Sequence, residues 1–288
     1  MTGPEIKAFF DEPTNAFSYV VWDPHARQAA IIDSVLEYDP ASGRTKHTPA
    51  DVIVAFVNAN HLNVQWLIET HIHADHLSAS AYIRSLVGGK IATGEHVQTV
   101  QNVFGKLFNA GSEFKRDGSQ FDHLFKDGEH YRIGHLEATA IATPGHTPSC
   151  MTHLIGNCAF VGDTLFMPDC GSARCDFPGG DAHMLYRSIQ KLFALPNDTR
   201  LFMCHDYKSP TRNEYGYETT VGEEKRTNIH LHEGISEADF VQMRNTRDAT
   251  LAVPRLLLPS IQVNMRAGQF PPAEENGIRY IKIPMDAL

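Results

Sequence analysis

The chain has 288 residues, 42% of them apolar, so it is long enough to bury a substantial core. Its formal net charge of −9, without any long run of Lys or Arg, argues against nucleic acid or an anionic membrane as the main partner. No apolar run approaches the roughly 18 residues that span a bilayer, and the amino end lacks a signal-peptide core. Five irregularly spaced cysteines do not suggest a disulfide framework. We therefore expect a soluble cytoplasmic protein.

The amino-terminal third predicts a hairpin, a helix and a buried strand, in that order. Residues 18–22 and 28–33 are strand-like and flank a turn at 23–26. Thr48 is expected to cap a helix over 49–59, with Pro49 in its first turn and Val52, Phe56 and Ala59 on one face. Residues 64–69 are apolar and β-prone, and they predict a buried strand that leads directly into a polar loop.

The loop after that strand carries the most informative motif of the chain. It reads Thr70-His71-Ile72-His73-Ala74-Asp75-His76, with three imidazoles and a carboxylate within seven residues. His71 and His73 stand two apart, so both rings can reach the same side of an extended backbone. Asp75 and His76 follow on the next turn. Imidazole and carboxylate groups at such spacing indicate a metal site rather than a chance cluster on a solvated loop.

The remaining elements follow in a similar alternation of helices and strands. Helices are expected over 80–86, ending at Gly88, over 96–108, and over 183–193. The apolar stripe of the second of these (Val97, Val100, Phe104 and Leu107) suits core packing or a dimer face. Strands are expected over 137–142, 151–161, 201–206 and 278–283. Cys150, Cys158 and Cys204 are expected to be buried packing residues, whereas Cys170 and Cys175 are expected near the site.

Three later segments end in further ligand-type side chains. A turn rich in Gly and Pro surrounds His146, an apolar run ends at Asp163, and another ends at His205. Taken singly, these residues have structural explanations: a turn residue, a helix cap and a hydrogen-bonded histidine. Together with the 70–76 loop, they place ligand-type groups after four separate strands, which favours one shared metal site.

This set of motifs resembles the metallo-β-lactamase superfamily over roughly residues 17–230. The resemblance implies an α/β (α+β) fold, a four-layer αββα sandwich with the metal in a cleft at one edge of the two sheets. We expect a single domain over 1–288, with an inserted region near 96–127 and a carboxyl-terminal extension over 256–288. Membership of such a superfamily does not fix the reaction, because one fold carries many chemistries.

Within the superfamily, the chain most resembles the persulfide dioxygenases. The matching segments are 70–78, 144–150, 162–165, 170–177, 204–207, 223–228 and 264–268. The resemblance implies a single iron(II) ion held by His71, His146 and Asp163, with the other face open for substrate and dioxygen. It also implies that glutathione persulfide is oxidised with O₂ to sulfite and glutathione. By the same resemblance, His73, Asp75, His76 and His205 are supporting residues around the metal.

The ligand count leaves an alternative open. His73, Asp75, His76 and His205 can also complete a two-metal site, which would suit a zinc-dependent thioester hydrolase of the glyoxalase II kind acting on glutathione thioesters. The basic carboxyl-terminal substrate segment of that group is not evident here. A third alternative is a redox-sensing or sulfur-binding protein without turnover.

Basic residues near the site are the candidates for binding the substrate carboxylates. By the resemblance, Arg174 is the loop arginine that would hold a glutathione carboxylate, and an ion pair with Asp176 is the equally weighted structural explanation. Tyr207 and Arg266 are further candidates for the same pocket. The expected partners are glutathione persulfide and O₂, and the expected assembly is a homodimer.

Overall fold

The computed structural model describes residues 3–287, so the ends of the predicted domain, residues 1, 2 and 288, lie outside the described residues. The first sheet has the order β1-β2-β3-β6-β8-β9, the second β10-β11-β12-β13-β14-β15, and a small third sheet β5-β4-β7. The strands of the first sheet are β1 (Glu5–Asp11), β2 (Ala16–Trp22), β3 (Gln28–Ile32), β6 (Asn63–Ile68), β8 (Lys90–Gly94) and β9 (His123–Phe125). Those of the second are β10 (Glu129–Ile133), β11 (Leu136–Ala142), β12 (Met151–Ile155), β13 (Cys158–Phe160), β14 (Arg200–Phe202) and β15 (Glu218–Thr220). The third sheet contains β4 (Val35–Asp39), β5 (Arg44–Lys46) and β7 (Leu77–Ser78).

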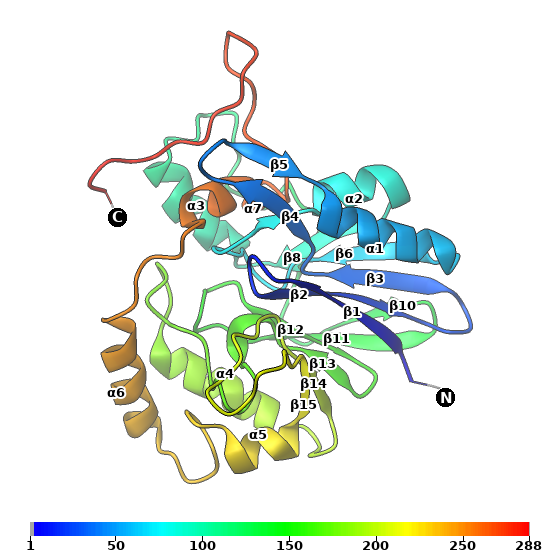
Figure 1. The fold of residues 1–288 in the computed structure, drawn as a ribbon, viewed down its shortest axis with the longest axis vertical. Coiled ribbons are helices and arrows are strands. Elements are labelled where there is room, and N and C mark those ends of the chain that lie inside the picture. Colours follow the sequence, from blue (N-terminus) through cyan, green and yellow to red (C-terminus); the bar gives the residue numbers. More distant parts are fainter. Residues whose placement is uncertain (1–2, 288) are drawn as a thin grey trace.

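The helices lie on the two outer faces of the stacked sheets (Figure 1). One face carries α1 (Thr48–Ala59), α2 (Ser80–Val87), α3 (Val97–Leu107) and α7 (Leu257–Asn264); the other carries α4 (Ala182–Phe193), α5 (Val221–Thr227) and α6 (Glu237–Asp248). A short 3₁₀ turn, η1 (Gly162–Thr164), follows β13. The predicted four-layer αββα sandwich is therefore confirmed.

Side-chain alternation along the strands builds the layers. In β2, Val20 and Trp22 pack into the core beneath the first group of helices, whereas Tyr19 and Val21 pack into the core between the two sheets. This is the two-residue period of a strand that is buried on both faces. A third core lies between the second sheet and α4, α5 and α6. The predicted hairpin of β2 and β3 is present, with antiparallel pairing.

Helix α1 differs from the sequence prediction in its start and in its buried face. The residue before its first turn is His47, so Thr48 lies inside the helix and does not cap it. Ala50, Ile53 and Val57 are buried, while Val52 is 53% exposed. The helix carries apolar residues on most of its circumference, so its packing partners, and not its sequence alone, decide which of these residues face inward.

Three predicted strands need correction, and one predicted stripe is confirmed. The strand predicted over 201–206 ends at Phe202, as β14. Residues 151–161 form two antiparallel strands, β12 and β13, because Gly156 adopts a φ of +60° in the turn between them. Residues 278–283 form no strand; Ile278 and Ile283 are 54% and 67% exposed on the surface. The α3 stripe packs in the core, as predicted, with Val97, Val100 and Phe104 buried.

Candidate metal centre

Four strands deliver the candidate ligands to one edge of the sandwich. The 70–76 loop follows β6, His146 follows β11, Asp163 follows β13 and His205 lies three residues after β14. Parallel pairing of β13 with β14 places the segments that carry Asp163 and His205 at the same end of the second sheet, and parallel pairing of β3 with β6 places Asp33 beside the 70–76 loop in the first. The sequence prediction that these segments share one edge therefore agrees with the geometry.

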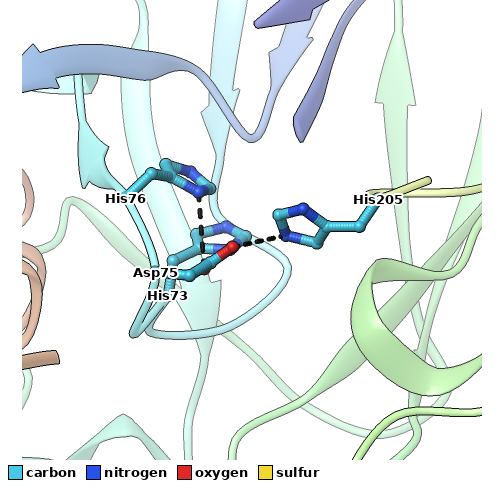
Figure 2. A group of neighbouring side chains, drawn as sticks. All are labelled: His73, Asp75, His76 and His205. Carbon is cyan, nitrogen blue, oxygen red and sulfur yellow. Dashed lines mark ion pairs between the residues drawn. The ribbon is translucent and has the colours of Figure 1, made fainter. Parts of the chain in front are cut away.

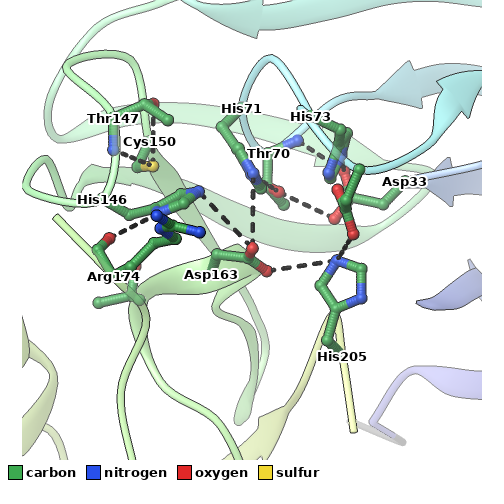
Figure 3. Close-up of polar contacts among 12 residues, drawn as sticks. Asp33, Thr70, His71, His73, His146, Thr147, Cys150, Asp163, Arg174 and His205 are labelled. Carbon is green, nitrogen blue, oxygen red and sulfur yellow. Dashed lines mark hydrogen bonds and ion pairs between the residues drawn. The ribbon is translucent and has the colours of Figure 1, made fainter. Parts of the chain in front are cut away.

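His71, His146 and Asp163 converge in a compact group (Figure 3). Oδ2 of Asp163 lies 3.8 Å from Nε2 of His71 and 3.7 Å from Nε2 of His146. All three side chains are more than nine-tenths buried. Two imidazoles and one carboxylate on one face form a donor set that suits a first-row transition metal and leaves positions open for other ligands.

A second group lies beside the first and contains His73, Asp75, His76 and His205 (Figure 2). Nε2 of His205 is 3.1 Å from Oδ2 of Asp75, and Nδ1 of His76 is 3.5 Å from Oδ1 of the same carboxylate. Asp163 connects the two groups, because its Oδ1 lies 3.6 Å from Nε2 of His205. The seven ligand-type side chains thus form one continuous cluster, with enough candidate ligands for one ion or for two.

The hydrogen bonds around the cluster fix which ring nitrogen carries the proton. Nδ1 of His146 lies 2.7 Å from the carbonyl oxygen of Arg174, and Nδ1 of His205 lies 3.1 Å from that of Asn15. A carbonyl oxygen can only accept, so each Nδ1 is the donor, and in the neutral ring each Nε2 then keeps its lone pair. That lone pair faces the cluster in both residues.

Asp33 fixes two of the three imidazole rings of the 70–76 loop, those of His71 and His73. Its Oδ2 accepts from the hydroxyl of Thr70 at 2.9 Å, so that hydroxyl in turn accepts from Nδ1 of His71 at 3.1 Å. Its Oδ1 accepts from the Thr70 amide at 2.8 Å and from Nε2 of His73 at 2.9 Å. His71 is therefore left with its Nε2 lone pair, and His73 with its Nδ1 lone pair.

The orphaned atoms of this cluster fit a bound cation. Nε2 of His71, Nδ1 of His73, Nε2 of His205 and Oδ1 of Asp163 are buried and have no hydrogen-bond partner. A buried polar atom without a partner costs about 1–3 kcal/mol, which a metal ion would offset. Burial and the neighbouring His73 also hold the pKa of His71 well below its usual range. The neutral imidazole that results is the form that binds metal.

Close backbone approach brings the separate segments together. Gly145 has a φ of +141°, and a Cβ there would lie 2.4 Å from backbone atoms of Leu185 in α4. Gly162 has a φ of +52°, and a Cβ there would lie 2.6 Å from Oγ1 of Thr70. Both positions therefore require glycine, the first to seat His146 and the second to bring Asp163 beside His71.

Sequence reasoning missed two residues that hold the loop. Asp33 directly follows the apolar strand β3 (Gln28–Ile32), and an acidic residue at the end of a buried strand was the available signal. Asn264 of α7 lies in the 264–268 segment that carries the family resemblance, but its contact with the metal loop was not predicted, because it is far along the chain. Its amide donates to the carbonyl oxygens of His73 and His76, both at 2.8 Å, and its Oδ1 accepts from the Ser78 amide at 2.8 Å.

The predicted substrate residues are only partly brought together. A cavity of about 470 Å³ contains His146 and Asp163 in its wall, along with Arg174 and Tyr207. The Arg174 guanidinium is bound to Asp176 by two hydrogen bonds of 2.5 Å, so the ion pair weighed from sequence is present. Arg266 lies elsewhere, in a separate cavity of about 400 Å³, with its guanidinium 4.2 Å from the Phe114 ring centre. Packing of the tail against the 108–116 loop keeps Arg266 away from the metal cluster.

The cysteines behave largely as packing residues. All five are free thiols, and Cys150, Cys158, Cys175 and Cys204 are buried. Cys170 is partly exposed and contributes to the cavity at the metal cluster, as expected for its loop.

The fold and a strand-edge cluster of histidines and aspartates define a metal-binding αββα protein. Residues 11–205 match the Metallo-beta-lactamase superfamily, and the chain belongs to that superfamily. Among residues 3–287, no helix is both long and apolar enough to cross a membrane.

Similar proteins carry two kinds of name. The chain is 55% identical to a probable metallo-hydrolase of Burkholderia pseudomallei, over 98% of this chain and 99% of that protein. It is 45% identical to Glyoxylase B2 of Dictyostelium discoideum, over 99% of this chain and 98% of that protein. It is 30% identical to the human mitochondrial persulfide dioxygenase ETHE1, over 91% of this chain and 88% of that protein. The crystal structure of ETHE1 from Myxococcus xanthus superposes with a TM-score of 0.73 at 27% identity, covering 92% of this chain and all of that one.

Proposed function

We propose that this protein is a glutathione-dependent persulfide dioxygenase. In this reaction glutathione persulfide, O₂ and water give glutathione, sulfite and two protons, so the terminal sulfur is oxidised and leaves the thiol. The observation that carries the proposal is the convergence of His71, His146 and Asp163 beside an open cavity. The similarity to the human and Myxococcus proteins along more than nine-tenths of this chain supports it.

The proposed cofactor is one iron(II) ion held by His71, His146 and Asp163. Bound there, iron(II) would supply the activation of dioxygen, which redox-silent zinc cannot supply. The chain's own contribution is orientation. Arg174 and Thr70 fix the tautomers of His146 and His71. Among the supporting residues, His205 lies beside the carboxylate of Asp163 and joins it to Asp75.

A second candidate function is zinc-dependent hydrolysis of a glutathione thioester. It is favoured by the second ligand group, His73, Asp75, His76 and His205, which adjoins the first through the contact of His205 with Asp163. The names of the Burkholderia and Dictyostelium relatives agree with it. The two candidates differ in the number of ions, in the metal and in the need for O₂.

The deciding experiment measures metal content and turnover in the same sample. Protein purified without added metal is analysed for iron and zinc, and O₂ uptake and sulfite are followed with freshly made glutathione persulfide. About one iron per chain with O₂ consumption supports the dioxygenase. Two zinc ions, no O₂ uptake and hydrolysis of S-lactoylglutathione would transfer the assignment to the hydrolase.

A matched pair of variants tests the division between the two ligand groups. His71→Ala is expected to lose the iron, whereas His76→Ala is expected to keep about one iron per chain. If His76→Ala instead lowers the metal content from two ions to one, the second group is itself a metal site. A cytoplasmic location and a homodimer remain expectations that accompany this proposal.

A further inference from the structure

Four arginines contribute to the cavity at the metal cluster, and two of them are already neutralised. They are Arg174, Arg244, Arg247 and Arg255. Arg174 is bound to Asp176, and Arg244 is bound to Asp248 at 2.7 Å and to the carbonyl oxygen of Ser172 at 2.9 Å. These two guanidinium groups hold the walls of the cavity in place, and their donors are committed to neighbours within the chain.

Arg247 and Arg255 differ from that pair. Both are exposed, and neither side chain has a hydrogen bond or ion pair with any other residue in the described range 3–287. Arg247 lies in the last turn of α6, and Arg255 lies in the segment that joins α6 to α7. The carboxylates in the same cavity wall, Asp75 and Asp163, are part of the metal cluster. Two unpaired cations therefore remain at this cavity in a chain whose net charge is −9.

We propose that Arg247 and Arg255 are specificity-determining residues that bind two carboxylates of the substrate. This inference rests on the proposed function, since it concerns the same cavity. A planar guanidinium matches a carboxylate with two parallel hydrogen bonds, so two of them select a small dianionic thiol derivative over a neutral one. Leu251, Pro254, Leu256 and Phe166 supply an apolar wall for the uncharged part of such a molecule.

Arg255 also borders a second cavity, which supplies a matched control. That cavity of about 740 Å³ contains Arg279 but none of the metal-cluster residues. Arg279 is exposed and unpaired with any carboxylate in the described part of the chain, like Arg247 and Arg255. Arg279→Gln thus removes the same charge from the protein without touching the cavity at the metal cluster.

The test measures binding directly, so that it does not depend on turnover. Calorimetry with the metal-loaded full chain compares glutathione with its diethyl ester, in which both carboxylates are masked. For glutathione, Arg247→Gln and Arg255→Gln are each expected to raise Kd about tenfold or more, and Arg279→Gln is expected to leave it unchanged. The diester is expected to bind the wild type about as weakly as glutathione binds the double variant.

Several results would overturn the inference without deciding the reaction. Equal glutathione affinity in wild type and both variants, equal affinity for the diester, or no glutathione binding at all would each do so. A loss in Arg279→Gln as large as in Arg255→Gln would move the binding site to the second cavity. Conversely, the protein could bind glutathione in an arginine-dependent way and yet consume no O₂. That result would support the inference about the arginines and would contradict the dioxygenase proposal.

A kinetic measurement gives a second readout in active protein. Because both arginines are exposed in the wall of the cavity and neither belongs to the ligand groups of the metal cluster, they are expected to act on substrate binding. Their Gln variants should therefore raise KM for glutathione persulfide with little change in kcat. A fall in kcat at unchanged KM would contradict this assignment.

Discussion

The backbone carbonyl of Arg174 fixes the orientation of His146, at 2.7 Å from its Nδ1, while the guanidinium of the same arginine is bound to Asp176. Arg174 thus acts on the metal cluster through its main chain. Its side chain stabilises the loop that carries this carbonyl. A residue selected from sequence as a substrate ligand therefore positions His146, a candidate metal ligand.

Arg174→Ala is therefore expected to reduce metal affinity rather than only to weaken substrate binding. Loss of the pair with Asp176 frees the loop, and the loss of such an outer contact lowers metal affinity on the order of tenfold. Metal per chain after dialysis against a chelator, with KM and kcat of the reloaded protein, would measure this. Arg132→Ala, which removes an exposed ion pair with Glu137, is the control. If the Arg174→Ala variant retained all of its metal and only its KM rose, the result would support the original assignment of Arg174 as a substrate-binding residue.

The Thr70 hydroxyl links Asp33 to His71, and its removal has a specific expected effect. Thr70→Val abolishes both hydrogen bonds and should lower metal affinity by about 10-fold or more, whereas Thr70→Ser should restore most of it. Thr93→Val is the matched control, because the buried Thr93 hydroxyl has no partner. Competition with a metallochromic chelator measures all three variants. Equal losses of metal affinity in Thr70→Val and Thr70→Ser would mean that packing of the Thr70 methyl group holds His71, and not the hydrogen bonds of the Thr70 hydroxyl to Asp33 and His71.

Gly145→Ala is expected to destabilise the fold and to displace His146. The new methyl group would overlap backbone atoms of α4, which cannot rotate away, so we expect a loss on the order of 2–3 kcal/mol in the free energy of unfolding. Gly43→Ala has open space around it and a φ of +67°, so only the backbone cost of about 1 kcal/mol applies there. Urea unfolding of both variants gives the comparison, and equal losses would show that the contact with Leu185 is not limiting.

The buried carboxyl group of Glu224 is expected to make the stability of the fold depend on pH, independently of the metal cluster. Burial raises the pKa of this carboxyl, which accepts from Asn228, to about 8. The unfolded chain releases the proton near pH 4.3. Between these values the folded state holds more protons, so the contribution of Glu224 to stability is lost as the pH rises.

Glu224→Gln should therefore gain stability over the wild type as the pH rises from 5 to 8, by at most about 1.4 kcal/mol per pH unit. Chemical unfolding of both proteins at pH 5, 6.5 and 8 measures this difference, and other titrating groups cancel in the comparison. Glu275→Gln, at an exposed position, should show no such trend. A constant difference between Glu224→Gln and wild type at all three pH values would argue against a proton on Glu224.

The local pattern of the sequence determined the layers and the ligand segments. Strand periodicity predicted β2, β3 and β6, and the position of His71, His146, Asp163 and His205 after strands predicted that they share one sheet edge. These inferences succeed because the end of a strand, and the residues that follow it, can be recognised from the sequence of that segment alone. Likewise, the α3 stripe was predictable because helical spacing alone places its apolar residues on one face.

Contacts between distant segments were decided only by the tertiary structure. Asp33 and Asn264 reach the metal loop from 37 or more positions away, and no spacing in the sequence encodes those hydrogen bonds. The same holds for Arg266, which the tail carries into another cavity. It also holds for Arg247 in α6 and Arg255 in the segment after it, which line the cavity at the metal cluster. Which arginine meets a carboxylate, and which stays unpaired, depends on how the layers pack. That information is absent from local periodicity.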